Sequence, residues 1–245
     1  LAFELPLNAV VPQRSVQERL LDLHGGTAHL ARRQLSFLHD ASVADDPTRL
    51  VRAARYGARL GFSLAPEAAQ QITDTLETWP WSWNLGYPPE QAPPALATRL
   101  RMELELLLSR EPWPQALELL QAWGGLALLD PGLQSDGWIL RRLGQARRLG
   151  LPLLTALVAG AADPIALAAR LQLPLQQQRV LQQQQCLLAW LVELRPEQVS
   201  GWSAADWTQV LERQAFAPEA VAQAVCVLAQ QPADGAPWKP LLRWW

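Results

Sequence analysis

Apolar residues recur every three or four positions over most of this 245-residue sequence, which places them on one face of an α-helix. The clearest case is residues 95–110, where leucines alternate in this period with Arg and Glu. Several of the segments begin near a proline and end near a glycine, as helices commonly do. The pattern predicts helices at about 47–60, 66–78, 95–110, 114–123, 139–149, 153–161, 165–171, 174–194, 204–213 and 218–230.

The first 34 residues follow a different pattern. Short apolar pieces at 1–5, 8–11 and 20–23 have the length and turn residues of extended segments. Gly25 and Gly26 allow a tight turn, and Thr27 is suited to cap a short helix that ends near residue 33. The whole sequence therefore predicts a mainly α, multi-helical fold that is preceded by a short α/β portion.

Residues 44–62 combine acidic and basic side chains in a helical pattern. Asp45 and Asp46 are good acceptors for the first backbone N–H groups of a helix, and Gly61 suits its end. Four arginines spaced by three, three and four residues fall on one face of that helix: Arg49, Arg52, Arg55 and Arg59. One interpretation is a solvated basic helix with an acidic cap. The other is a site for an anion and a base edge, because arginine binds phosphate and an Asp–Arg pair offers complementary acceptors and donors.

Composition narrows the choice of partners. The formal net charge is −2, so nucleic acid can be bound only through local basic patches. Two cysteines, Cys186 and Cys226, make no disulfide framework and have no metal-ligand spacing, which favours a reducing cytoplasm. No apolar run is long enough to predict a membrane span.

Other candidate groups give weaker signals. His39 and Asp40 form the dipeptide of metal phosphohydrolases, but no histidine follows it, so a structural role is favoured and no metal ligands are predicted. Trp79, Trp81 and Trp83 alternate in a Pro-rich loop, where filling a groove between helices is favoured over stacking on bases. A second basic cluster is either a solvated helix face or a phosphate-binding patch for RNA; it consists of Arg141, Arg142, Arg147 and Arg148.

Three motifs in this sequence resemble those of one family. Residues 45–62 resemble the nucleotide-selecting motif of class II tRNA nucleotidyltransferases (CCA-adding enzymes) and bacterial poly(A) polymerases, with Asp45 where the family has Glu. Asp22-Leu-His-Gly-Gly26 resembles the family's D-P-x-G-G turn, and Arg99-Leu-Arg-Met-Glu103 resembles its E-R-x-x-x-E motif. The resemblance covers about residues 1–110.

The resemblance implies a division of the chain and a function. Residues 1–34 correspond to the end of a nucleotidyltransferase head domain, 35–110 to a helical neck, and 111–245 to a helical body and tail. It also implies a cytoplasmic enzyme, which adds CMP or AMP from CTP or ATP to the 3′ end of tRNA or other RNA.

The resemblance also implies roles for individual residues. Asp46 and Arg49 read the base of the incoming nucleotide, while Arg52 and Arg55 reach its phosphates or brace that pair. Asp45 caps the helix or orients Arg49. Supporting roles fall to the remaining motif residues, Asp22, Gly25, Gly26, Arg99 and Glu103.

The family's catalytic segment has no counterpart in this sequence. Its paired Asp-x-Asp holds two Mg²⁺ ions and precedes all three motifs in the family. We therefore expect the polypeptide alone not to catalyse nucleotide addition. The alternative hypothesis is a non-catalytic helical module that binds RNA or a protein partner. The motifs do not distinguish addition of CCA, CC, A or poly(A).

Overall fold

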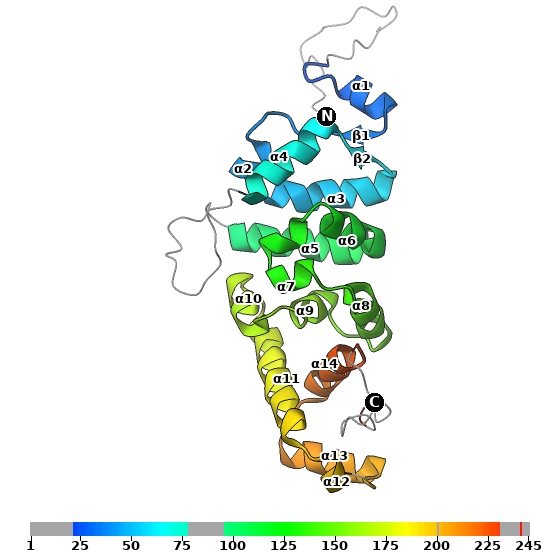
Figure 1. The fold of residues 1–245 in the computed structure, drawn as a ribbon, viewed down its shortest axis with the longest axis vertical. Helices are drawn as coiled ribbons and strands as arrows, with labels where there is room; N and C mark the ends of the chain where they lie inside the picture. Colours follow the sequence, from blue (N-terminus) through cyan, green and yellow to red (C-terminus); the bar gives the residue numbers. More distant parts are fainter. Residues whose placement is uncertain (1–21, 78–95, 200, 231–240, 242–245) are drawn as a thin grey trace, which may run out of the picture.

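The computed structural model describes residues 22–77, 96–199, 201–230 and 241. Within these ranges the molecule is a stack of helical layers along one long axis (Figure 1). The mainly α prediction is confirmed. The predicted extended pieces at 1–5 and 8–11, and the Trp79–Trp83 triplet, lie outside the described residues.

The layer nearest the N-terminus is built around a single long helix. It contains α1 (Gly26–Ala31), β1 (Gln34–Leu35), α2 (Ser42–Asp45), α3 (Thr48–Leu60), β2 (Ser63–Leu64) and α4 (Pro66–Glu77). α3 ends as predicted at Gly61, whose φ of 64° is left-handed and favours glycine. The chain then turns back, and β2 pairs with β1 in parallel, with Leu64 opposite Leu35. This two-residue pair is too short to appear in the hydrophobic pattern.

Over the described residues, the middle layers consist of seven helices, and the first two of them pack directly against α3. They are α5 (Leu96–Arg110), α6 (Trp113–Ala122), the 3₁₀ helix η2 (Gly125–Leu128), α7 (Pro131–Gln134), α8 (Ile139–Arg148), α9 (Leu153–Val158) and α10 (Pro164–Arg170). Asp130 caps α7, since its carboxylate accepts hydrogen bonds from the backbone N–H groups of Gly132 and Leu133.

The C-terminal layers pack against the longest helix of the described residues, α11 (Leu175–Glu193). α12 (Pro196–Val199) and α13 (Ala204–Arg213) lie at the far end, and α14 (Pro218–Leu228) returns along α11 toward α8 (Figure 1). Ser203 and Asp206 form a capping box at the start of α13.

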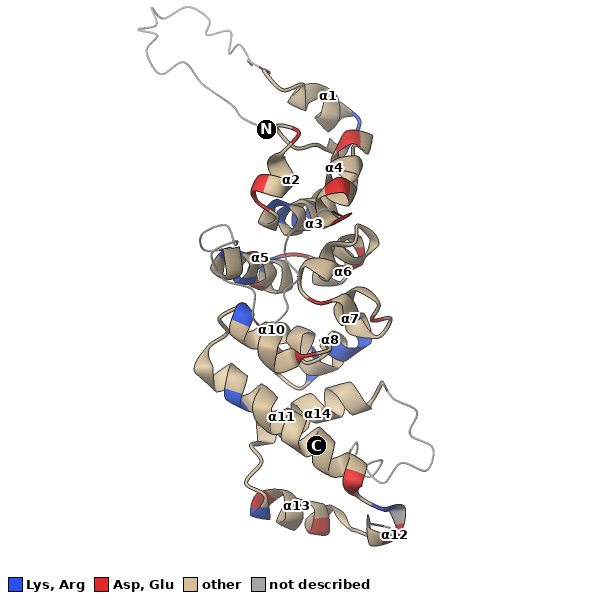
Figure 2. Ribbon diagram, turned by 60° about the vertical axis from the view of Figure 1, so that its left-hand side comes forward, with Lys and Arg blue, Asp and Glu red and all other residues tan. Residues whose placement is uncertain are grey.

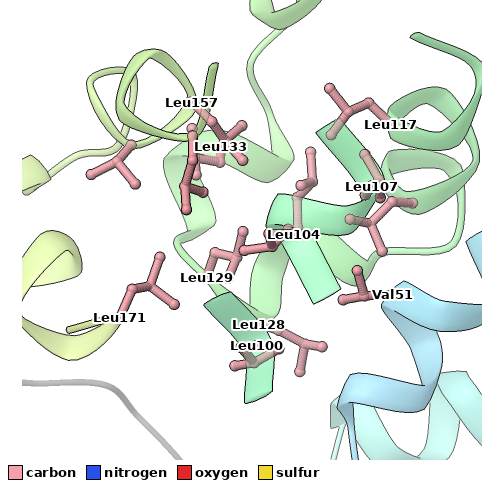
Figure 3. Packing of buried hydrophobic residues seen from close by; sticks show 14 of the residues in the cluster. Val51, Leu100, Leu104, Leu107, Leu117, Leu128, Leu129, Leu133, Leu157 and Leu171 are labelled. Atoms are coloured by element: carbon pink, nitrogen blue, oxygen red, sulfur yellow. The ribbon is translucent and has the colours of Figure 1, made fainter. Parts of the chain in front are cut away.

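One continuous hydrophobic core runs from α2 to the beginning of α11. Figure 3 shows leucines of α5, η2 and α7 meeting there with residues of α3, α6, α9 and the end of α10. A second core joins α11, α13 and α14 through Leu187, Trp207 and Val225, and a third, smaller one joins α8, α9 and α14. Burial of this apolar surface is the main favourable term in folding.

The ten predicted long helices are all present, most within one or two residues of the expected ends. The main difference is α9, predicted to reach residue 161, which ends at Val158 because Gly160 and Ala161 turn back to hydrogen-bond Leu157 and Val158. The hydrophobic pattern did not predict the one-turn elements α2, η2, α7 and α12. No helix in the described part of the chain has both the length and the apolar character required to cross a bilayer.

Candidate functional site

Asp46 lies at the junction between α2 and α3 in an extended conformation. One carboxylate oxygen, Oδ1, accepts hydrogen bonds from the backbone N–H of Thr48 at 3.2 Å and from its hydroxyl at 2.7 Å. The other, Oδ2, is 3.2 Å from the guanidinium of Arg99 on α5. Each carboxylate oxygen has two lone pairs, so Asp46 is held in place and can still accept a bond from a ligand.

Asp45, by contrast, does not cap α3. It is the last residue of α2, and its carboxylate lies 3.9 Å from the ring of His39. The reason is local: the chain completes one turn of helix at Ser42–Asp45 and changes direction at Asp46, which leaves Asp46 alone next to the first N–H groups of α3.

Arg49 occupies the first turn of α3 and is anchored through one nitrogen. Its Nη1 donates to the hydroxyl of Ser42 at 2.8 Å and to the carbonyl of Ser42 at 3.1 Å, and it lies 3.4 Å from Nε2 of His39. Nε and Nη2 make no hydrogen bond to the described part of the chain. Arg49 therefore presents one unused edge of its donor fork.

The remaining arginines of the stripe meet two buried glutamates. Basic residues gather on α3 (blue in Figure 2), and Glu103 on α5 and Glu111 just after α5 lie opposite them. The contacts alternate in charge along α3, and we call them the charge ladder: Arg52, Glu103, Arg55, Glu111 and Arg59.

Arg52 and Arg55, which were predicted to share one role, differ in their exposure within the charge ladder. Arg55 is only 7% exposed and bonds to both glutamates, which makes it a brace between helices and directs it away from any ligand. Arg52 bonds to Glu103 but keeps half of its side chain exposed. Only Arg52 of this pair is therefore open to a phosphate.

Hydrogen bonding shifts the pKa values along the charge ladder. The bond to Glu103 raises the pKa of Arg52, and the bond to Glu111 raises that of Arg59. Burial by itself raises the pKa of Glu111, but the bonds from Arg59 and Arg55 together outweigh it, so the pKa lies below its usual value. Glu111, Arg52 and Arg59 are therefore charged at neutral pH.

A pocket of about 660 Å³ opens beside this part of α3. Arg49, Arg52 and Ser42 supply polar groups to its wall. The rest of the wall is largely apolar and comes from Leu35, Phe37, Leu38, Tyr56, Leu60 and Leu64. A flat apolar ring and an anionic group fit such a combination of surfaces.

The motif around Asp22 forms a tight turn at the start of α1. The Asp22 carboxylate accepts bonds from the backbone N–H groups of Gly26 and Thr27 and from the Thr27 hydroxyl, and Gly25 has a φ of 66°. The bond from the Thr27 hydroxyl is the main reason why the pKa of Asp22 lies well below its usual range. Asp22, rather than Thr27, is thus the acceptor that opens α1.

Arg99 and Glu103 link α5 to α3 through Asp46, Arg52 and Arg55. Residues four apart on one helix can pair with each other, but Arg99 and Glu103 form these ion pairs between helices. His39, Ser42 and Glu111 were missed as site residues. The one sequence feature that points to them is the high density of arginine on α3, because buried arginines require carboxylates opposite them.

The second basic cluster divides in the same way. Arg142 is 4% exposed and is held inside by Asp136 at 2.5 Å and the Ala156 carbonyl at 3.0 Å. Arg141, Arg147 and Arg148 are exposed, and Arg141 lies over the ring of Trp138 at 5.6 Å. Only these three can form a surface patch.

Mg²⁺ does not fit the residues that the structure describes. No group of three or more His, Cys, Asp or Glu side chains among them is arranged to hold a metal ion. No step that depends on a metal is therefore assigned to these residues.

No protein-family model matches the sequence. Among characterised proteins, the CC-adding tRNA nucleotidyltransferase of Deinococcus radiodurans is 40% identical over 163 residues, which is 63% of this chain and 37% of that protein. The CCA-adding enzyme of Bordetella bronchiseptica is 30% identical over 151 residues, or 61% of this chain and 38% of that enzyme. The chain thus spans less than two-fifths of either relative.

Solved structures show the same fold. The complex of a CCA-adding enzyme with ATP matches 91% of this chain and 53% of that chain, with a TM-score of 0.60 and 19% identity. A structure described as tRNA-processing enzyme complex 3 matches 93% of this chain and 63% of that chain, with a TM-score of 0.59 and 18% identity.

Proposed function

We propose that this chain, a relative of the tRNA nucleotidyltransferases, is the nucleotide-selecting and RNA-holding part of an enzyme that adds nucleotides to tRNA 3′ ends. The matched segment spans less than two-fifths of either relative, so the catalytic carboxylates and their Mg²⁺ ions are proposed to lie outside this chain. Residues 1–34, 35–110 and 111–245 are assigned to the end of the head, the neck, and the body with the tail. The proposed location is the cytoplasm.

The observation that carries this proposal is the way Asp46 and Arg49 are held at the start of α3, where Arg49 lines the pocket. Asp46 is fixed by Thr48 and Arg99 and retains acceptor capacity, while Arg49 is fixed by Ser42 and retains two donor nitrogens, Nε and Nη2. An acceptor beside a donor fork complements the edge of cytosine or adenine. A protein pair of this kind selects a nucleotide without a nucleic-acid template.

Other residues complete the proposed site. The apolar wall receives the base, and Arg52 faces the phosphates, since it combines exposure with a place on the pocket wall. Arg55, Glu103 and Arg99 brace α3 against α5, and Asp22 with Gly25 and Gly26 orders the turn before α1. Arg141, Arg147 and Arg148 are proposed to contact the RNA backbone.

Nucleotide binding to the purified chain tests this proposal. We expect Arg49→Ala and Asp46→Ala to weaken binding of CTP and ATP by about tenfold or more, because each removes charged hydrogen bonds to the base. Arg213→Ala is the matched control, since Arg213 is exposed on α13 at the other end of the molecule. The assignment would be refuted if the two site variants bound CTP and ATP as tightly as the wild type and the control variant do.

The longer parent enzyme provides the second arm of the test. In it, the same two substitutions should scramble the choice between CTP and ATP during addition to a tRNA primer. Unchanged incorporation in the parent, with RNA still bound, would favour the alternative of a non-catalytic RNA-binding module.

A further inference from the structure

We propose that His39 is a positioning residue that holds Arg49 against the pocket, and that protonation of the His39 ring releases this hold. The inference rests on the proposed role of Arg49. It adds a residue outside the three motifs and makes nucleotide affinity depend on pH.

The first observation is the contact between the two side chains. Nη1 of Arg49 lies 3.4 Å from Nε2 of His39. A guanidinium can only donate hydrogen bonds, so the contact is favourable only when Nε2 carries no proton and serves as the acceptor. The ring must then be neutral, with its proton on Nδ1.

The second observation is that His39 sits on a fixed backbone. The side-chain amide of Gln71 on α4 donates to the carbonyl of His39 at 3.0 Å and accepts from the N–H of Val43 at 2.9 Å. This two-point contact fastens residues 39–43, which lead into α2 and form its beginning, to α4. Ser42, which gives Arg49 its two other acceptors, lies in the same segment and is 1% exposed.

With the ring proton on Nδ1, His39 and the two oxygens of Ser42 therefore place three acceptors around a single nitrogen of Arg49. Because all three engage Nη1, the Nε and Nη2 edge is left for a ligand, and its direction is set before the ligand arrives. Such preorganisation improves affinity, since the long side chain loses less conformational freedom on binding.

The charges around the ring define what protonation does. Arg49 faces Nε2 of the ring from α3, Asp45 faces the same nitrogen from α2 at 3.9 Å, and α4 contributes the uncharged Gln71 amide, which bonds to the His39 carbonyl. A protonated ring repels the guanidinium and is attracted to Asp45. Half of the His39 side chain is exposed, so solvent protons reach it directly. Histidine changes charge in the range where enzymes work, which makes this contact a pH-sensitive one.

The tautomer of His39 is the first test, and it needs no nucleotide. Nitrogen NMR of the histidine rings distinguishes a protonated Nδ1 from a protonated Nε2, and His24 and His29 are the only other histidines. At about pH 7.5 we expect the Nδ1–H form for His39. An Nε2–H form would overturn the proposal, whether or not the chain binds nucleotides.

Nucleotide affinity is the second test. At about pH 7.5, His39→Ala should weaken CTP and ATP binding by about five- to tenfold, while His39→Gln, whose amide oxygen also accepts, should stay within about twofold of wild type. His24→Gln is the control for loss of an exposed imidazole. Thermal unfolding of each variant verifies that it is folded.

The pH profile separates positioning from a structural role. Between about pH 7.5 and 5.5, wild-type affinity should fall more steeply than that of His39→Gln, which cannot take up the proton. Protonation of the nucleotide's own phosphates affects both proteins equally, so it cancels when the wild-type affinity is divided by that of His39→Gln at each pH. Identical profiles would overturn the proposal. Absence of CTP and ATP binding to the wild-type chain would instead refute the proposed function and leave the tautomer as the test of the contact.

Discussion

Glu111 is the residue on which the charge ladder depends most. Its side chain has no exposed surface, yet it accepts hydrogen bonds from both Arg55 and Arg59. It sits immediately before Pro112, between α5 and α6, so it ties the junction of these helices to α3. A buried carboxylate of this kind is stabilising only while its partners remain in place.

We predict that Glu111→Gln destabilises the protein by on the order of 3 kcal/mol at neutral pH, because Arg55 and Arg59 lose their shared anion. Urea-induced unfolding measures the change. Glu105→Gln is the control: Glu105 is exposed and lies 3.7 Å from Arg101, and an exposed pair contributes about 0.5 kcal/mol. A loss no larger than that of the control would show that the charge ladder contributes nothing to stability.

The pH dependence of this effect follows from the lowered pKa of Glu111. A carboxylate whose folded-state pKa is depressed contributes stability above its unfolded pKa, and the contribution is lost as the pH falls through the folded value. The difference between wild type and Glu111→Gln should therefore narrow as the solution is acidified below the usual range of glutamate.

At the scale of elements, the site depends on how closely α3 approaches α6. Gly57 lies on the face of α3 between Leu119 and Trp123, and a Cβ there would come within 3.0 and 3.2 Å of their side chains and within 3.2 Å of the Phe62 carbonyl. The absence of a side chain thus permits the contact between the two helices. That contact also fixes the distance between α3 and α6.

We predict that Gly57→Ala destabilises the protein by about 1–3 kcal/mol through overpacking. Gly144→Ala, on α8, is the matched control. A Cβ there meets nothing within 4 Å, and replacing a helical glycine by alanine stabilises by about 0.5–1 kcal/mol. Thermal and urea unfolding of both variants test the prediction, which fails if the two changes have the same sign.

Periodicity predicted these elements well wherever a helix has one buried face. α13 was predicted at its observed residues, and the structure has Ser203 as its cap and Trp207 and Leu211 on its buried face. One-turn elements such as α2 and α7 were missed. Four residues make only about one helical turn, which is too short to show a repeating pattern. Such elements are instead stabilised by contacts from distant segments, such as that of Gln71 with Val43.

The same limit applies to the site. The arginine stripe could be predicted from spacing, because its four members lie on α3, whereas the roles of Asp46 and Arg49 came from the resemblance of the motif. Burial of Arg55 and Arg142 could not be predicted, since it depends on Glu103, Glu111 and Asp136 being brought to them by tertiary packing. The support of Arg49 by His39 and Ser42 likewise requires the change of direction at Asp46.

At the scale of the whole molecule, α14 connects parts that would otherwise be separate. Val221 and Val225 belong to the core shared with α11 and α13, whereas Ala222 and Cys226 belong to the core shared with α8 and α9. Val227 packs against the large N-terminal core. Because one helix contributes to all three cores, unfolding of either end should remove support from the other.

Cys226 reports on this coupling. It is fully buried, and burial raises the pKa of its thiol to about 12 although the charges of Arg142 and Arg148 oppose the rise. Cys186, on α11, is exposed. Since the thiolate is the reactive form, we predict that an alkylating reagent at neutral pH labels Cys186 rapidly in the native protein and labels Cys226 only after α14 has separated from α8 and α9.

A Cys186→Ser variant turns this difference into a measurement of cooperativity. In it, labelling of Cys226 can be followed against urea concentration together with helical circular dichroism. We predict that the two transitions coincide, because opening α14 exposes apolar surface from all three cores at once. Labelling at clearly lower urea than the loss of helix would mean that the C-terminal layers open as an independent unit. The stack would then consist of two separately stable parts, and α14 would be a contact between them and not their shared core.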